Sequence, residues 1–334
     1  MKKLGLKIAG WTALLYCGLL LITLAFETSA AGQHTTISLY RDYPRSIYAN
    51  TAHYAVYGMD RLDDHPRQVF ILGASVPGQA FDPELLMEEL PGYKVHNLSV
   101  SGSNITQMEQ VIDLLSTQVD WRTLDSAIFV FGGHFVSFLE NERKFGGMTK
   151  IETEELRHHL YRLEDGNAHP VLHGPLMNAA LFMAKPFAFL YKLKFESTGA
   201  FNDAKIALVG MVRKTVQEVP PSDAAYYRAF REKQFRSEPL LDEQFDRFHA
   251  LAARLKAGGA RVVFADMPVP GYFRDDFFAY TDYQKKVKRI SRDKTVHYLD
   301  LTDFAPDSQF LDDSHPRPEF AARWSAALAE YLLK

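Results

Sequence analysis

Three side chains that stand far apart in the sequence are of the types that acyl transfer needs. Ser75 ends an apolar run, and Asp312 and His315 stand three positions apart near the other end of the chain. A serine hydroxyl is a poor nucleophile until an imidazole takes its proton, and a carboxylate can hold that imidazole in one tautomer. The three residues therefore predict a catalytic triad, with Ser75 as nucleophile, His315 as general base and Asp312 as the group that orients the ring.

Attack by a serine also needs donors for the negative charge that develops on the carbonyl oxygen. Glycine turns let backbone N–H groups approach such an oxygen closely, because glycine has no side chain in the way. Two turns of this kind follow apolar runs, Ser-Gly-Ser around Gly102 and Gly-Gly-His from Gly132 to His134. We expect the N–H groups of Ser75 and Gly102 to hold the oxyanion, with Gly132 or His134 as a further donor.

Each of these signals has an ordinary structural explanation when it is taken alone. A small residue often ends a buried strand, a glycine often occupies a turn, and the Asp-x-x-His loop before Pro316 can cap a helix. Their joint occurrence favours catalysis, because all of them follow strand-like runs and could meet at one rim of a sheet.

The elements that must position these residues alternate between strand-like and helix-like patterns. The runs that predict strands are 67–75, 93–104, 124–135, 260–270 and 296–304. The segments that predict helices are 83–90, 105–118, 240–259 and 317–333. Alternation of this kind indicates a parallel sheet covered on both faces, and such sheets bind ligands beyond the carboxyl ends of their strands. The sequence predicts an α/β protein, a three-layer α/β/α sandwich with a mainly parallel five-stranded sheet and its site at one rim.

The N-terminal segment predicts where the chain is placed in the cell. Lysines within residues 1–7 precede an uncharged apolar run, 8–26. Its length is close to the ~20 residues of a spanning helix and exceeds the ~7–15 residues of a secretory signal. We expect a single-pass anchor in the cytoplasmic membrane, with residues 1–7 in the cytoplasm and the chain from Glu27 onward in the periplasm. The alternative is a signal sequence cut within 27–32, which also leaves the rest of the chain extracytoplasmic.

The remaining boundaries follow from changes in the pattern. The expected parts are a juxtamembrane lead-in, a first half of the α/β domain, a mainly helical insertion or cap, and a second half of the α/β domain, at 27–66, 67–139, 140–239 and 240–334.

Two features of the expected insertion have competing interpretations. An apolar stretch at 175–195 is interrupted by Lys185-Pro186, so it is a poor spanning helix. We interpret it as a buried helix pair, and a membrane-facing or partner-docking surface is the alternative. The insertion also holds histidines, but no carboxylate or cysteine pattern beside them supports a metal site; they are His158, His159, His169 and His173.

Composition and charge narrow the class of protein. The net charge of −3, with no basic stripe interleaved with aromatic residues, gives no reason to expect nucleic acid as a partner. The single cysteine, Cys17, excludes an internal disulfide and a cysteine-based metal site. The basic run 285–294 is interpreted as a solvated surface, with contact to acidic lipids as the alternative. The predicted chemistry needs no metal and no organic cofactor.

At the predicted site the sequence resembles the SGNH, or GDSL-type, superfamily of hydrolases and acyltransferases. The run Ile-Leu-Gly-Ala-Ser, which ends at Ser75, is similar to the first block of the family, and the turn at Gly102 is similar to the second. The last block, Asp-x-x-His, matches Asp312 and His315. The third block is Gly-x-Asn, and here His134 stands where the family has an asparagine that donates to the oxyanion. A histidine can also donate through one ring N–H, so the sequence does not decide whether Gly132 or His134 is the third donor.

Within that superfamily the layout resembles membrane-anchored members of the DltD type and the O-acetylation proteins of exopolysaccharide systems. The resemblance rests on the anchor, the insertion and the segments 267–283 and 310–324. It implies acyl transfer, with acetyl as the expected group, to hydroxyls of a cell-envelope or secreted polysaccharide. The acyl group would come from a membrane-bound O-acyltransferase partner, and a sugar or polyol would be the acceptor. An esterase of the same fold, and an inactive scaffold or glycan-binding subunit, remain as alternatives.

Overall fold

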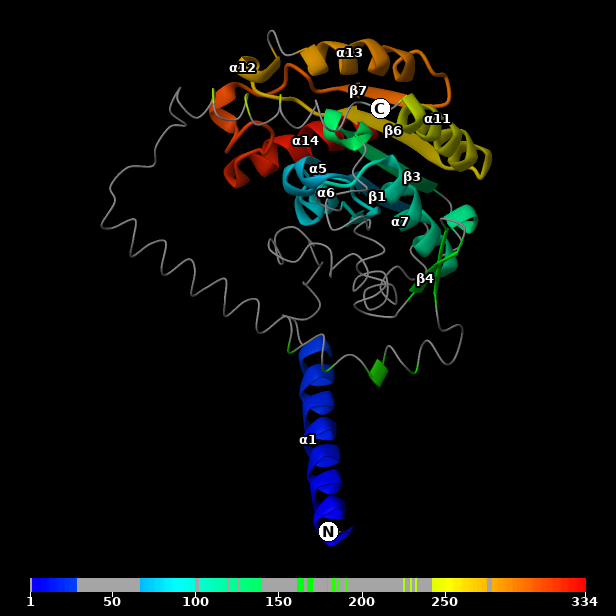
Figure 1. Ribbon diagram of the computed structural model, residues 1–334, viewed down its shortest axis with the longest axis vertical. Helices are drawn as coiled ribbons and strands as arrows, with labels where there is room; N and C mark the ends of the chain where they lie inside the picture. The colour runs from blue at the N-terminus through cyan, green and yellow to red at the C-terminus, as the bar shows by residue number, and fades with distance from the viewer. Residues whose placement is uncertain are drawn as a thin grey trace, which may run out of the picture. The chain divides into compact units, whose positions relative to one another are not determined.

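The computed structural model describes the parts of the chain on which the prediction of the fold depends (Figure 1). Apart from a few single positions between 179 and 232, the described residues are 2–28, 67–99, 102–118, 121–124, 126–139, 161–164, 167–170, 242–274 and 278–334. The chain divides into two compact units. One contains Met1–Ile37, Val56–Gly58 and Leu172–Thr215, and the other contains the remaining residues.

A five-stranded, all-parallel sheet forms the centre of the larger unit, which confirms the predicted α/β class. In spatial order its strands are β2 (Lys94–Asn97), β1 (Arg67–Gly73), β3 (Ser126–Gly133), β6 (Arg261–Asp266) and β7 (His297–Asp300). All five predicted strands are present. The chain moves from β1 to β2 on one side and then to β3 on the other side of β1, so the topology switches at the carboxyl end of β1. Ligands of open parallel sheets bind at such a point.

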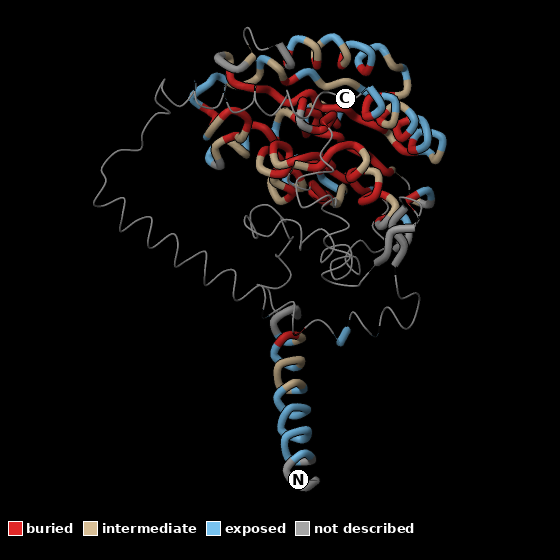
Figure 2. Tube along the Cα trace, in the orientation of Figure 1, coloured by how far each residue is buried: buried red, intermediate tan, exposed pale blue. Residues whose placement is uncertain are grey.

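Helices cover both faces of the sheet and complete the three layers. One face carries α5 (Ser75–Ala80), α6 (Pro83–Glu89) and α14 (Ala321–Leu332), and the other carries α7 (Ile105–Gln118), α11 (Asp242–Ala257) and α13 (Phe278–Ile290). Strand side chains alternate between the two cores, as the twofold period of a strand requires. Within β3, Ile128 and Val130 pack toward α14, whereas Phe129 and Phe131 pack toward α7 and α11. Figure 2 shows the buried sheet between partly exposed helices.

Two longer helices and a hairpin of two strands were not predicted, and neither was the one-turn helix α12 (Gly271–Arg274). Helix α5 begins at Ser75 itself, which we expected to be the last residue of the first strand. Helix α13 occupies a region for which we expected no helix. A two-stranded antiparallel hairpin, β4 (Tyr161–Glu164) and β5 (Asn167–Pro170), lies within the insertion that we expected to be mainly helical. Much of that insertion lies outside the described residues.

The smaller unit contains the N-terminal helix α1, Lys2–Thr28, which includes the predicted apolar run. Its segment Lys7–Ala25 is long and apolar enough to cross a membrane. A signal sequence near an N-terminus passes the same test of length and composition.

Candidate active site

The three residues predicted as a triad form one chain of hydrogen bonds. Ser75 Oγ lies 2.7 Å from His315 Nε2, and His315 Nδ1 lies 2.7 Å from Asp312 Oδ2. An ionised carboxylate can only accept, so Nδ1 carries the ring proton of a neutral His315 and Nε2 is left to accept from Ser75. This is the arrangement in which a histidine can remove a proton from a serine hydroxyl.

The loop after β7 holds the histidine and the aspartate in place. A backbone bridge joins Phe310 to Pro316, and Leu311 N–H donates to the His315 carbonyl at 2.7 Å. Inside this loop Asp312 Oδ1 accepts from the N–H groups of Ser314 at 2.9 Å and His315 at 2.8 Å. One carboxylate oxygen is thus fixed by the backbone, so that the other oxygen faces the imidazole.

The same contacts determine the ionisation of Asp312. Partial burial acts to raise its pKa, because desolvation disfavours the charged carboxylate. The hydrogen bond and the charge interaction with His315, together with the N–H groups of His315 and Ser314, outweigh this effect, and the pKa of Asp312 lies below its usual value. Asp312 is therefore a carboxylate at neutral pH, as its orienting role requires.

Close packing fixes the position of Ser75 at the end of β1. A Cβ atom on Gly73 would lie 2.2 Å from Pro77 Cγ, and one on Gly132 would lie 2.3 Å from Pro77 Cβ. Neither distance is compatible with a side chain, so α5 can lie against β1 and β3 only because both positions are glycine. The glycine at 132, predicted as an oxyanion donor, thus has a packing reason as well.

Two polar residues that we did not predict connect β2 to the same place. The buried Asn97 amide donates to the carbonyls of Phe81 at 2.9 Å and Pro77 at 3.2 Å, and so binds the end of α5. Ser103 Oγ donates to the Gly73 carbonyl at 2.8 Å, next to Gly102, whose φ is +64°. The left-handed backbone at Gly102 gives the residue a conformational reason to be glycine.

Gly102, Gly132 and His134, three of the predicted oxyanion donors, lie at or beyond the carboxyl ends of their strands. They are not part of the hydrogen-bond chain of the triad. His134 follows β3, is 1% exposed and has its ring centroid 3.9 Å from that of Phe135. Ser75 lies in the first turn of α5, where backbone N–H groups have no partner within the helix. The roles of Ser75 N–H, Gly102, Gly132 and His134 in holding an oxyanion stay predictions.

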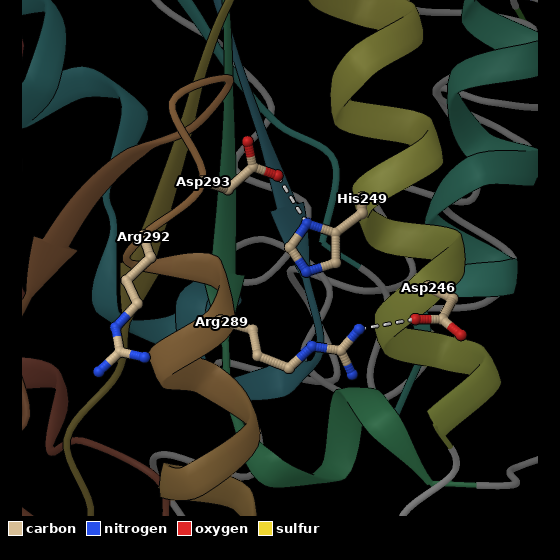
Figure 3. A pocket seen from close by; sticks show the side chains of 5 residues that line it. All are labelled: Asp246, His249, Arg289, Arg292 and Asp293. Atoms are coloured by element: carbon tan, nitrogen blue, oxygen red, sulfur yellow. Dashed lines mark hydrogen bonds and ion pairs between the residues drawn. The ribbon is translucent and has the colours of Figure 1, made fainter.

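A second histidine–aspartate pair lies between α11 and the turn that precedes β7 (Figure 3). His249 Nδ1 lies 2.6 Å from Asp293 Oδ2, and Arg289 pairs with Asp246 at 3.2 Å beside it. These four residues and Arg292 line a hollow of about 400 Å³. None of the five lining side chains carries a hydroxyl or a thiol, so this pair has no nucleophile to activate within its hollow.

A third carboxyl group, Asp266 at the end of β6, is held by tyrosines. Tyr283 donates to Oδ1 at 2.7 Å and Tyr298 donates to Oδ2 at 2.6 Å. Burial raises the pKa of Asp266 to about 7 against the lowering effect of the two hydroxyls, and Asp300 raises it further. Its side chain lies in the core on the α13 side of the sheet, whereas α5 and Ser75 belong to the other side.

No group of three or more histidine, cysteine, aspartate or glutamate side chains is arranged to hold a metal ion among the described residues. The histidine side chains of the expected insertion lie outside this part of the structure.

Comparisons with known proteins give a match among solved structures. No family model and no curated protein matches the chain. Among solved structures, a GDSL-like lipase from Bacteroides thetaiotaomicron matches at 11% sequence identity with a TM-score of 0.35. The match covers 86% of this chain and 97% of the lipase. By its own fold and site, the chain is a three-layer α/β/α protein with a hydrogen-bonded serine, histidine and aspartate at the carboxyl edge of a parallel sheet.

Proposed function

We propose that the protein is a serine-dependent acyltransferase of the SGNH type that acylates hydroxyls of a cell-envelope or secreted polysaccharide. The observation that carries the proposal is the unbroken hydrogen-bond chain from Ser75 through His315 to Asp312. An inactive scaffold or glycan-binding subunit would have no need for this alignment at the switch point of the sheet.

The proposed reaction proceeds through an acyl-serine. His315 Nε2 takes the proton of Ser75 while Oγ forms a bond to the carbonyl carbon of the acyl donor. The bond to the donor's leaving group then breaks, and His315 returns the proton to that group. In the second half a sugar or polyol hydroxyl attacks the acyl-serine, His315 takes its proton, and the Ser75 oxygen leaves and regains a proton. Each half uses one histidine as base and then as acid, so no cofactor is consumed.

Charge develops on the carbonyl oxygen in both halves of this reaction. The proposed donors are the backbone N–H groups of Ser75 and Gly102, with Gly132 or His134 as a third. The sharp turn at Gly102 and its link through Ser103 to the end of β1 support this assignment, because they fix the β2 loop beside the nucleophile. Preorganised donors of this kind stabilise the transition state without rearranging during the reaction.

The proposed setting is the outer face of the cytoplasmic membrane. The apolar helix α1 supports a single-pass anchor, and the N-terminal lysines favour a periplasmic catalytic domain. A membrane-bound O-acyltransferase partner would supply the acyl group, with acetyl as the expected one. The resemblance to anchored members of the superfamily supports the partner and the polysaccharide acceptor.

An esterase that removes acyl groups from such a polymer is the second candidate, and one observation favours it. The side chains of His315 and Asp312 keep 24% and 25% of their surface exposed, so water can reach the base. An acyltransferase must exclude water from its acyl-serine, or bind the acceptor fast enough to outcompete it.

The test uses the full-length chain in detergent with p-nitrophenyl acetate as the acyl donor, with and without a neutral oligosaccharide acceptor. We expect acetylated oligosaccharide with the natural chain and none with Ser75→Ala. Release of acetate alone, also dependent on Ser75, would replace the transferase by the esterase. If neither product depended on Ser75, even with a membrane-bound O-acyltransferase added, both enzymatic candidates would be wrong.

A further inference from the structure

Helix α1 makes a specific contact with a segment that is far from it in the sequence. The Tyr16 hydroxyl donates to the backbone carbonyl of Met183 at 2.5 Å and also lies 3.6 Å from the Met183 sulfur. Met183 belongs to residues 172–215, which cluster with α1 in one compact unit. The contact is therefore internal to the smaller unit.

The position of Tyr16 along α1 determines how deep this contact would lie in a membrane. The membrane-compatible segment runs from Lys7 to Ala25, and Tyr16 is its middle residue. With a rise of ~1.5 Å per residue, the hydroxyl-bearing residue lies roughly 13 Å from either end of that segment. A bilayer has a hydrocarbon core of about 30 Å, so a spanning α1 places Tyr16 and its partner near the middle of the core.

The exposure of α1 shows that one face of its second half is covered. Every described side chain of α1 before Tyr16 is exposed. From Tyr16 onward a stripe at helical spacing is partly or fully covered, formed by Tyr16, Leu19, Leu20, Thr23 and Leu24. Thr23 keeps only 1% of its surface exposed. Figure 2 shows the same change from an exposed first half of α1 to a partly covered second half. Residues three and four apart share a helix face, so this stripe is a packing surface.

Large apolar side chains near Met183 are partly exposed in the described part of this segment. Phe182, Met183 and Leu190 keep 43%, 51% and 45% of their surface exposed. Ala179, Pro186 and Leu190 are also described as helical, and with Met183 they recur at three- and four-residue spacing. Of these four residues Pro186 is buried and the others are exposed. Large apolar side chains that are this exposed, in one compact unit with a helix that is itself apolar and long enough to span a membrane, are suited to lipid acyl chains and not to water.

We propose that Phe182, Met183 and Leu190 lie inside the bilayer beside the second half of α1, so that two elements hold the protein in the membrane. Lipid acyl chains surround these three side chains, and the hydrogen bond from Tyr16 sets their depth in the bilayer. A tyrosine hydroxyl in hydrocarbon needs an acceptor, and the Met183 carbonyl supplies one. This proposal stands apart from the acyltransferase proposal, because it requires α1 to remain on the chain but does not require the triad to be active.

The test measures the depth of residue 183 in the full-length chain. Cys17→Ala removes the single natural thiol, and Met183→Cys then carries a polarity-sensitive thiol fluorophore in phosphatidylethanolamine–phosphatidylglycerol vesicles. The matched control places the label at Leu333→Cys, which is 63% exposed in the α/β unit. We expect a nitroxide in the middle of the lipid acyl chains to quench the label at 183 and aqueous iodide to leave it unquenched. The control should show the reverse.

Two results would overturn the proposal. One is quenching by iodide at 183 as strong as at the control position, which would place Met183 in water. The other is recovery of a chain from cells that has lost α1 and is washed off membranes by carbonate. Phe182→Cys repeats the measurement at the neighbouring exposed residue, so a folding defect of the Met183→Cys chain would not decide the outcome.

Discussion

Two histidine–aspartate pairs in the larger unit are closely alike, and only one is joined to a nucleophile. Asp312 and Asp293 each accept from a histidine Nδ1, at 2.7 and 2.6 Å, and each also accepts from N–H groups of its own loop. For both carboxyls, burial acts to raise the pKa and the hydrogen bonds outweigh it, so both pKa values are lowered. The difference lies at Nε2. His315 Nε2 has the Ser75 hydroxyl at 2.7 Å, whereas the hollow beside His249 is lined by charged side chains.

The two pairs also lie at opposite ends of β7. Asp293 precedes the amino end of the strand, and its bond to His249 ties the turn to α11. Asp312 follows the carboxyl end, at the edge where Ser75 leaves β1. A histidine held by an aspartate thus links two elements of the fold in one place and is a candidate catalytic base in the other. The position at the sheet edge, and the presence of a serine beside the histidine, therefore decide which role the pair has.

The largest expected effect comes from removing the nucleophile. Ser75→Ala should lower kcat for acyl transfer or ester hydrolysis by roughly 10⁴-fold or more, because loss of one triad member is nearly as damaging as loss of all. Steady-state kinetics on an activated acetyl ester measure this. Ser308→Ala, at an exposed serine, is the matched control and should keep the natural kcat. Similar rates for the natural chain and Ser75→Ala would remove the distinction between the two pairs.

The next test makes the same substitution in both pairs. Asp312→Asn should lower kcat by about 10³–10⁴, since the amide no longer holds His315 in the tautomer that accepts from serine. Asp293→Asn should leave kcat unchanged and lower the free energy of unfolding by about 1 kcal/mol through its weakened bonds to His249 and Thr295. Kinetics and urea unfolding of both variants give the answer. Equal effects on kcat would show that the pair of His249 and Asp293 also affects the site.

A smaller effect is expected at His134, the third proposed donor of the oxyanion hole. If His134 donates to the oxyanion, His134→Ala should lower kcat by about 10²–10³ with little change in KM, as loss of one donor does elsewhere. His134→Asn restores a side-chain N–H donor and should recover most of the rate. The two variants are compared by kcat and KM on the same ester. Loss of activity with no recovery in the asparagine variant would assign His134 to packing against Phe135.

The smallest expected effect concerns Asp266, a carboxyl held by tyrosines instead of histidine. Its pKa rises from 3.8 to about 7 on folding. Between these values the unfolded chain has already released the proton that the folded chain still holds, so stability should fall as pH rises through this window and level off above about 7. Asp266→Asn should remove this part of the slope in urea unfolding between pH 5 and 8. A slope unchanged by the substitution would contradict the raised pKa.

Much of the fold followed from the sequence because its signals are local. The three central strands, β1, β3 and β6, are apolar runs buried on both faces, and such runs are visible without a structure. The strand order is not local, since it depends on which side of β1 each crossover returns. Helix α13 was missed because we interpreted its lysines and arginines as surface. Its buried stripe, formed by Tyr280, Tyr283, Val287 and Ile290, occurs at helical spacing and continues into that charged run.

The site was predictable to a different extent. The residue types of the triad and their order followed from the sequence, but the hydrogen bonds that join Ser75 to His315 depend on packing across the whole sheet. Asn97 and Ser103 gave no usable signal, because an amide or a hydroxyl after a strand can serve many loops. The glycine at 132 was assigned a catalytic role from its turn, and its contact with Pro77 required the position of α5.

The most direct test of the central claim is to trap the acyl group on the protein. The full-length chain is mixed with p-nitrophenyl acetate, stopped with acid after a brief interval, digested and examined by mass spectrometry, with His315→Ala treated in the same way. We predict one acetyl group on the peptide that contains Ser75, formed quickly in the natural chain and far more slowly without His315. Turnover of the ester with no acetyl group on Ser75, or with equal acetylation in the two chains, would contradict the account.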